Sequence, residues 1–419
     1  MSNLKVVIAC FMAIYVAVNQ ASLVLGQDQQ LQTAQEAMEL IGQGKPLPAI
    51  VRLEKGPIER EMASQLLAAI YSFAGDEEKA YILQSDRQKG NLVVPPMDTQ
   101  RVSALEYVLT RAKDRQIVII NESHDSPRHR QFISQLAKGL REIGFEYFAC
   151  EALSEEGDSL RKRGYPVHST GFYTCEPVFG QLLRHVLRLD YKPIAYESES
   201  DTSTDDPIQG INQREEQQCK NLLDRLLLKL PKARILIHVG GDHVMESARK
   251  AGNQEIHWLA ARLKKETGID PLTIDQTTNV KSEKEIGDRQ DVPGVLITPR
   301  GEAFVGGHFR GAVDIQVYHP PLQIREGRPT WMFADKSLIP VSIPTEVKLE
   351  EGKLLVQAFH ADESDDAVPA DQIIVSSAGV RPPLMLREGR YRIATQDSTG
   401  KQSSYGPLDV STGAVGAKQ

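Results

Sequence analysis

The sequence predicts an α/β protein with a mostly parallel sheet covered by helices on both faces, an N-terminal helical segment and a small C-terminal β-domain. The chain has 419 residues, 41% hydrophobic and 25% charged, which is ordinary globular usage. From Val102 onward, short apolar runs alternate with amphipathic stretches, as buried parallel strands and their covering helices do. After Thr345, alternating runs are separated by Gly, Pro, Asp and Ser, which is typical of antiparallel strands and turns.

The first residues predict export. Lys5 precedes an apolar run from Val6 to Val18, and small residues up to Gly26 lead into a polar stretch, the pattern of a secretory signal peptide. The run is shorter than the roughly 20 residues that span a bilayer, so a membrane anchor is less favoured, as is lipoprotein cleavage before Cys10. We expect residues 1–26 to be a signal peptide and the mature protein to be periplasmic or secreted, with no transmembrane span.

The segment 27–95 predicts helices. Apolar residues recur at helical spacing over 34–41 and 63–73, and breaks at Gly44-Lys45-Pro46 and Gly75-Asp76 separate two or three amphipathic helices. We interpret this segment as a packing appendage. Pro95-Pro96 marks a boundary, so we place the main domain at 96–335 and the C-terminal β-rich domain at 336–419.

Strands and helices alternate through the main domain. The helix over 127–143 carries the fullest set of signals, with Ser126 suited to the N-cap, Pro127 to the first turn and Gly144 to the C′ position. Further helices are expected at 103–112, 178–189, 213–230 and 255–267. Strands are expected at 116–120, 145–150, 192–196, 234–239 and 271–275, with one more at 313–318.

Polar side chains follow most of these strands. In an open parallel sheet, ligands bind outside the carboxyl ends of the strands. One acidic residue there is often a helix cap or a solvated group, but a coincidence at four strands points to a site. His238 lies within its strand and is expected to be a hydrogen-bonded core residue. The residues that follow the strands are Glu122, His124, Glu151, Glu197, Gly240-Gly241, His243 and Asp275.

Two chemistries fit such a His/Glu site. The sequence lacks GxSxG, HExxH, GxxxxGK[ST] and a GxGxxG after a strand, so the serine-hydrolase, zincin, P-loop and dinucleotide classes lose their main support. In the first chemistry, Glu122 or Glu151 orients a histidine, and His124 or His243 takes a proton from a water that attacks an ester or amide carbonyl. In the second, the imidazoles and carboxylates bind a divalent metal. The metal candidates are then His124, His243, Glu122 and Glu151.

Charge and cysteine content limit the partners. Lys plus Arg number 49 and Asp plus Glu 56, a net charge of −7 with no basic block, which argues against nucleic acid. A small-molecule ligand or substrate is expected instead, and Arg128, at the start of the helix after the first strand, could face it. Cys150, Cys175 and Cys219 have no paired spacing, so neither a disulfide framework nor a cysteine zinc site is indicated, although one bridge remains open.

Four segments together resemble a known superfamily, which unites erythromycin-esterase-like proteins, ChaN-like haem-uptake proteins and Tiki-type proteases. The similarity covers about 116–276. The first segment is closer to the ChaN-like form, Gly-Glu-x-His-Asp, whereas the arginine–acid–asparagine spacing is closer to the esterases. The segments are 121–129, Glu151, Arg214-Glu215 with Asn221, and 240–243.

The resemblance implies a shared site made of Glu122, His124, Glu151 and His243, with Arg214 orienting a carboxylate or substrate. The polar residues after the strands add Glu197 as a substrate contact. Asn121 stands where the family usually has glycine, and Gln218-Cys219 where it has Met-Ala.

Members hydrolyse esters, cleave peptides or bind haem, so membership does not select a reaction. The first hypothesis is an exported esterase-like hydrolase. The alternative is a non-catalytic haem- or metal-binding protein, with Tyr173 or a histidine as axial ligand. A third possibility places the function in the terminal domains.

Overall fold

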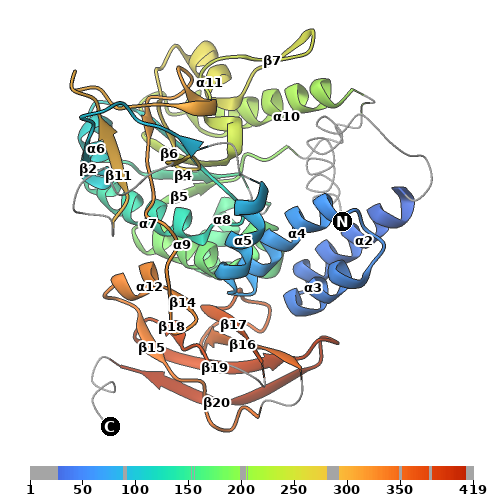
Figure 1. Ribbon diagram of the computed structural model, residues 1–419. Helices are drawn as coiled ribbons and strands as arrows, with labels where there is room; N and C mark the ends of the chain where they lie inside the picture. Colours follow the sequence, from blue (N-terminus) through green and yellow to red (C-terminus); the bar gives the residue numbers. More distant parts are fainter. Residues whose placement is uncertain are drawn as a thin grey trace.

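The computed structural model describes residues 27–87, 92–151, 153–154, 156–198, 204, 206–280, 292–348, 352–376 and 380–411. The predicted signal peptide, 1–26, lies outside these residues. Figure 1 shows N-terminal helices, a central α/β unit and a C-terminal antiparallel sheet, so the predicted fold class is confirmed. No helix in the described part of the chain has the length and apolar character needed to cross a membrane.

The central sheet has six strands in the order β12-β9-β3-β6-β4-β5, and every neighbouring pair is parallel. Each predicted strand is present, within a few residues of its expected bounds. Every residue of β3 and β6 is buried, as expected for strands covered on both faces. The strands are β3 (Ile117–Glu122), β4 (Tyr147–Cys150), β5 (Lys192–Ile194), β6 (Ile235–Gly240), β9 (Leu272–Asp275) and β12 (Ile315–Gln316).

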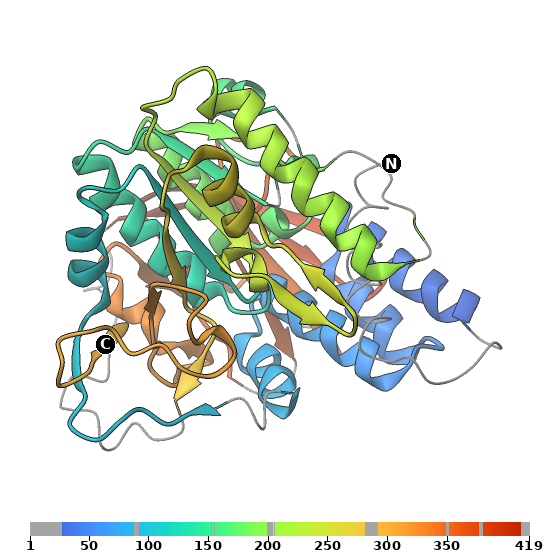
Figure 2. The ribbon, with the colours of Figure 1, turned by 90° about the horizontal axis from the view of Figure 1, so that it is seen from above.

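Helices cover both faces of this sheet. One face packs against α6 (Ala104–Ala112), α7 (Pro127–Glu142) and α9 (Pro177–Arg188). The other face packs against α10 (Pro207–Leu222) and α11 (Leu259–Thr267). In Figure 2, α10 is the long yellow-green helix that lies over this face. The helix expected over 255–267 starts later than predicted, because its first residues form β8 and pair with β7 instead. Smaller elements are α8 (Gly157–Arg163), α12 (Thr330–Ala334), β7 (Arg249–Ala251) and β8 (Gln254–Ile256).

The N-terminal segment forms more helices than predicted. Pro46 begins a helix, because proline is well tolerated in a first turn, where the missing N–H would have no partner. Apolar side chains of these helices belong to the same core as β3 and α7, so the segment packs onto the main domain rather than beside it. The helices are α2 (Gln27–Gly42), α3 (Pro46–Lys55), α4 (Arg60–Phe73) and α5 (Glu77–Arg87).

The C-terminal region is an antiparallel sheet in the order β17-β16-β19-β20, joined to the main domain by buried ion pairs. Arg184 on α9 binds Glu363, with both side chains nearly inaccessible, and Arg328 binds Asp371 at 2.6 Å. The strands are β16 (Lys353–His360), β17 (Asp371–Ser376), β19 (Gly389–Gln396) and β20 (Gln402–Val410), with β15 (Ile339–Val341) paired to β18 (Leu384–Leu386). Short pairs elsewhere are β1 (Leu92–Val93) with β10 (Asn279–Val280), β2 (Gln100–Ser103) with β11 (Gly294–Ile297), and β13 (Ile324–Arg325) with β14 (Arg328–Pro329).

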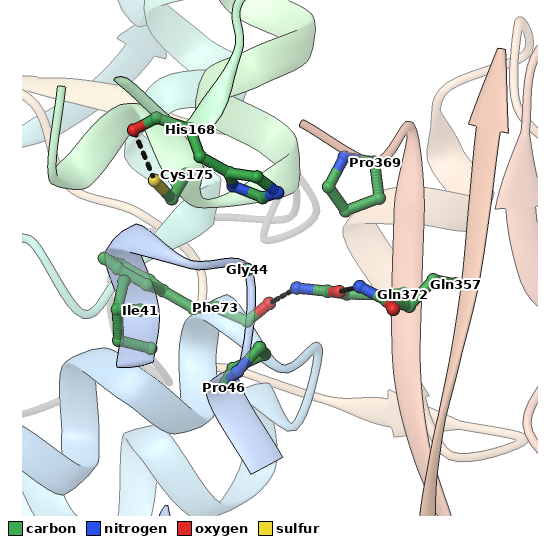
Figure 3. Close-up of a pocket in the computed structure, with 9 residues that line it drawn as sticks. All are labelled: Ile41, Gly44, Pro46, Phe73, His168, Cys175, Gln357, Pro369 and Gln372. Atoms are coloured by element: carbon green, nitrogen blue, oxygen red, sulfur yellow. Dashed lines mark hydrogen bonds between the residues drawn. The ribbon is translucent and has the colours of Figure 1, made fainter. Parts of the chain in front are cut away.

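A small cavity lies where the three parts meet (Figure 3). Phe73 reaches it from the N-terminal helices, His168 and Cys175 from the main domain, and Gln357 and Gln372 from the C-terminal sheet. The cavity has a volume of about 10 Å³, which is room for one water molecule. None of the predicted site residues lines it. The cavity is a packing gap between parts, and the site must be sought at the sheet edge.

The three cysteines in the described part of the chain are free and buried. Burial raises the pKa of Cys150, Cys175 and Cys219, which keeps these thiols protonated. The bridge that the sequence left open is not formed, and these residues act as small apolar side chains in the core.

Candidate functional site

The predicted site residues meet at the carboxyl edge of the central sheet. β6 lies between β3 and β4, so the residues that end these strands become neighbours. Glu122 is opposite Gly240 in the β3–β6 register, and the N–H of Glu151 donates to the carbonyl oxygen of His238. Segments roughly 90 to 120 residues apart in the sequence therefore meet at a single edge, with His243 one short turn after β6.

Glu122 is a buried carboxylate bound on both oxygens. Arg130 donates from Nε to Oε2 and from Nη2 to Oε1, both at 2.7 Å. The Nδ1 of His124 lies 2.8 Å from Oε1, and the Nε2 of His238 lies 2.9 Å from Oε2. Burial alone would raise the pKa of Glu122, but the charges of Arg130 and His238 outweigh it and hold that pKa well below its usual range. Glu122 is therefore ionised and can orient His124.

Arg130 is itself fully buried and held by α9. Its Nη1 donates to Glu176 at 2.9 Å, and its Nη2 donates to the carbonyl oxygen of His124 at 3.0 Å. Glu176 is the N-cap of α9 and also accepts from the N–H groups of Val178 and Phe179. The sequence analysis did not identify Arg130. A charged residue on the apolar face of a helix, three positions before Ile133, was the signal that could have found it.

His124 binds Glu122 through one ring nitrogen, and its other ring nitrogen points away from Glu122. Its side chain is 27% exposed, and its ring stacks on Tyr173 with 3.7 Å between centroids and 15° between planes. A carboxylate accepts only from Nδ1–H, so the contact with Glu122 selects the tautomer whose Nε2 is an acceptor. That edge of the ring faces Gly240, where a Cβ would lie 2.7 Å from Nε2. No hydrogen bond to Nε2 is formed within the described part of the chain, so this nitrogen can take a proton.

Glu151, Arg214 and Glu197 form a second cluster beside His124. The Nη2 of Arg214 donates to Glu151 at 2.6 Å and to Glu197 at 2.8 Å. The N–H of Gly240 donates to the other oxygen of Glu151 at 2.6 Å. Burial would raise the pKa of Glu151, but the charges of His243 and Arg214 lower it strongly. The carboxylate is ionised, and Arg214 crosses from α10 to bind the residues that follow β4 and β5.

His243 is the cationic member of this cluster. Its Nδ1 lies 2.6 Å from Glu215, and its Nε2 lies 3.4 Å from Glu151 and 3.4 Å from Arg214. Burial alone would lower the pKa of His243, but the carboxylates of Glu215 and Glu151 raise it to about 9. His243 is thus an imidazolium at neutral pH and a hydrogen-bond donor. Of the two histidines considered as general base, the geometry favours His124.

Arg128 and Glu215 are two more residues whose partners the structure shows. The Arg128 guanidinium donates to the carbonyl oxygen of Pro320 at 2.6 Å. Glu215, which the sequence showed only as part of a motif, is fully buried and ties His243 to the first residue of α11, Leu259, whose N–H it accepts at 2.7 Å. Both outcomes depend on how the helices pack, which no local pattern encodes.

The donor set does not fit a divalent metal or haem. In the described ranges, no three His, Cys, Asp or Glu side chains are grouped to hold a metal ion. Glu122 and Glu151 each have both oxygens bound to protein donors, and removing an arginine from either would leave a buried cation unpaired. Tyr173, considered as an axial ligand, lies flat on His124 and is 7% exposed. The mechanism proposed below therefore uses neither a metal ion nor haem.

No family model matches the chain, and no curated protein does. Among solved structures, one described as a crystal structure of bacterial protein toxins is 13% identical with a TM-score of 0.33, covering 51% of this chain and 45% of that chain. A second, described as bacterial protein toxins, is 14% identical with a TM-score of 0.34, covering 66% and 65%. A third, the type III effector HopBA1, is 13% identical with a TM-score of 0.30, covering 55% and 98%. The chain thus matches less than two thirds of the first two, and these distant similarities leave function to be argued from the site.

Proposed function

We propose that this protein is a hydrolase that acts on an ester or amide carbonyl with a water activated by His124. The observation that carries the proposal is the ordered series Arg130–Glu122–His124. A buried cation fixes a buried carboxylate, and that carboxylate binds Nδ1 of a partly exposed imidazole. This is the arrangement by which a second group orients a general base and stabilises the imidazolium formed during reaction.

The steps follow from the positions of the charges. His124 Nε2 takes a proton from water as the water oxygen bonds to the carbonyl carbon, and the carbonyl oxygen becomes negative. We expect Arg214 and the imidazolium of His243, which both contact Glu151, to stabilise that developing charge. When the tetrahedral intermediate collapses, the bond from carbon to the leaving oxygen or nitrogen breaks, and the proton on His124 Nε2 passes to the leaving group. The products are a carboxylic acid and an alcohol or amine.

The sequence motifs support the same reading. We infer that the chain belongs to the superfamily of erythromycin-esterase-like, ChaN-like and Tiki-type proteins, because the residues that carry that resemblance are those that meet at the sheet edge. We also propose that the protein is exported, on the pattern of residues 1–26. Neither inference selects the substrate, which is why a screen over several carbonyl classes is the first experiment.

The test is a hydrolase screen with esters, lactones and peptides, repeated with a chelator. The expected result is turnover by the wild type that the chelator leaves intact and that His124→Ala lowers by about 10²–10⁴, the range for one general base. His257→Ala is the matched control, because His257 lies outside the site with its side chain 50% exposed. No turnover on any class, an activity that requires added metal, or a fully active His124→Ala variant would refute the proposal.

A further inference from the structure

The N-terminal helices reach the loop that carries His124. Gln84, on α5, is 6% exposed, and its Nε2 donates to Ser123 Oγ at 2.9 Å and to Asp125 Oδ1 at 2.7 Å. Ser123 Oγ in turn donates to Asp125 Oδ1 at 2.6 Å. Ser123 and Asp125 are the two neighbours of His124 in the sequence. A single buried amide thus binds the side chains of the two residues on either side of the candidate base.

A second contact from the same helices supports the imidazole ring itself. Phe73, the last residue of α4, lies edge-on to Tyr173 with 6.5 Å between ring centroids and also packs on Phe172 at 5.6 Å. Tyr173 is the ring on which His124 stacks. Edge-to-face and stacked aromatic pairs hold their partners in a defined orientation. The end of α4 therefore fixes the face of His124, while α5 fixes its loop.

The turn between α4 and α5 is held firmly from the other side as well. Gln372, on β17, donates to the carbonyl oxygen of Phe73 at 2.5 Å, and Trp331, on α12, donates to Glu77 at 3.1 Å. Gly75, inside the turn, has a φ of +77°, and a Cβ there would lie 1.9 Å from the carbonyl oxygen of Gln372. The helices can therefore act as a rigid support, because their own position is determined by packing and hydrogen bonds.

We propose that the N-terminal helical segment is a working part of the site, with Gln84 as the positioning residue that holds His124 in the orientation needed for the proposed reaction. This inference rests on the proposed function for its kinetic consequence, but not for its geometry. The loop 123–126 connects β3 to α7 and has a hydroxyl and a carboxylate facing α5. Without the Gln84 amide, Ser123 and Asp125 lose this buried donor, and the loop can shift within the contacts that His124 keeps. A displacement of about 1 Å can reduce a rate up to ~10²-fold.

The experiment uses the full chain with Gln84→Met, which keeps the length of the side chain and removes only its amide. Gln84→Ala is the second variant, and Gln32→Ala is the matched control, because Gln32 makes an exposed hydrogen bond to Glu36 on α2. Folding is checked by circular dichroism. With a substrate from the screen, kcat is expected to fall about tenfold or more in both Gln84 variants with KM nearly unchanged, and the control to match the wild type. A loss confined to KM would contradict a positioning role.

A second readout requires no substrate. In protein labelled with ¹⁵N-histidine, the ring resonances of His124, assigned by their loss in His124→Ala, are expected to shift in the Gln84 variants and to stay in place in Gln32→Ala. If these resonances are unchanged in a folded Gln84 variant, the inference is overturned whatever the activity. If they shift while the wild type hydrolyses nothing, Gln84 does position His124 and the proposed function is wrong.

Discussion

Arg130→Met tests the buried charge network most directly. Arg130 is fully buried and donates four hydrogen bonds, two to Glu122, one to Glu176 and one to the carbonyl oxygen of His124. Both carboxylates are nearly inaccessible, at 1% and 2% exposure. Removing one member of a buried pair costs about 3–5 kcal/mol, because the partner stays buried without compensation. Two carboxylates lose their cation here, so we expect the upper part of that range.

The pH dependence gives this prediction its sign. In the wild type the pKa of Glu122 is depressed, so its pairing stabilises the fold above about pH 4.5 and is lost as the pH falls. In Arg130→Met, the guanidinium that lowers the pKa of Glu122 and Glu176 is gone, so burial raises both pKa values relative to the wild type, where that of Glu176 is already raised. The destabilisation is therefore largest at neutral and alkaline pH. The deficit relative to the wild type is therefore expected to shrink between pH 8 and pH 5, as the two carboxyls take up protons.

The assay is denaturant unfolding of the wild type and the variant at several pH values, with Arg161→Met as the control. Arg161 pairs with Asp190 at the surface, with side chains 45% and 66% exposed, and such a pair contributes about 0–1 kcal/mol. An Arg130→Met deficit under about 1 kcal/mol at pH 7, or one that stays constant from pH 5 to pH 8, would show that the network does not carry the charges assigned to it.

Three further outcomes are expected. Gly240→Ala should lower turnover by tenfold or more with a small stability loss, since its Cβ would meet the ring of His124 at 2.7 Å; wild-type kinetics would contradict this close approach. Glu215→Gln should lower the pKa of His243 from about 9 by about one unit or more, as measured by NMR titration. The loss of stability of this variant relative to the wild type should be largest below about pH 6.5 and should disappear as the pH rises past about 9. Asn121→Ala should cost about 1–3 kcal/mol in denaturant unfolding, because its amide binds the ends of neighbouring strands; a neutral effect would mean that water replaces it.

The order of strands and helices could be predicted because it depends on local patterns. The apolar runs of β3 and β6 are buried on both faces, and α7 begins at Pro127 and ends before Gly144 as its capping residues indicate. The rule that ligands bind at the carboxyl ends of parallel strands also selected residues that the structure brings together, because strand direction is the same for the whole sheet. The helix that begins at Pro46 was missed, because a proline that starts a helix was read as a break between helices.

The sequence by itself determined the α/β class, the positions of the strands and the set of acidic and imidazole residues at their ends, because hydrophobic period and strand direction are properties of short segments. Only the tertiary structure decided what each of these residues does. The orientation of His124 depends on Arg130, which holds Glu122, and on Tyr173, and the charge of His243 depends on Glu215. These three residues come from separate helical regions. Burial makes each such pairing strong, and burial arises only when those regions pack against the sheet.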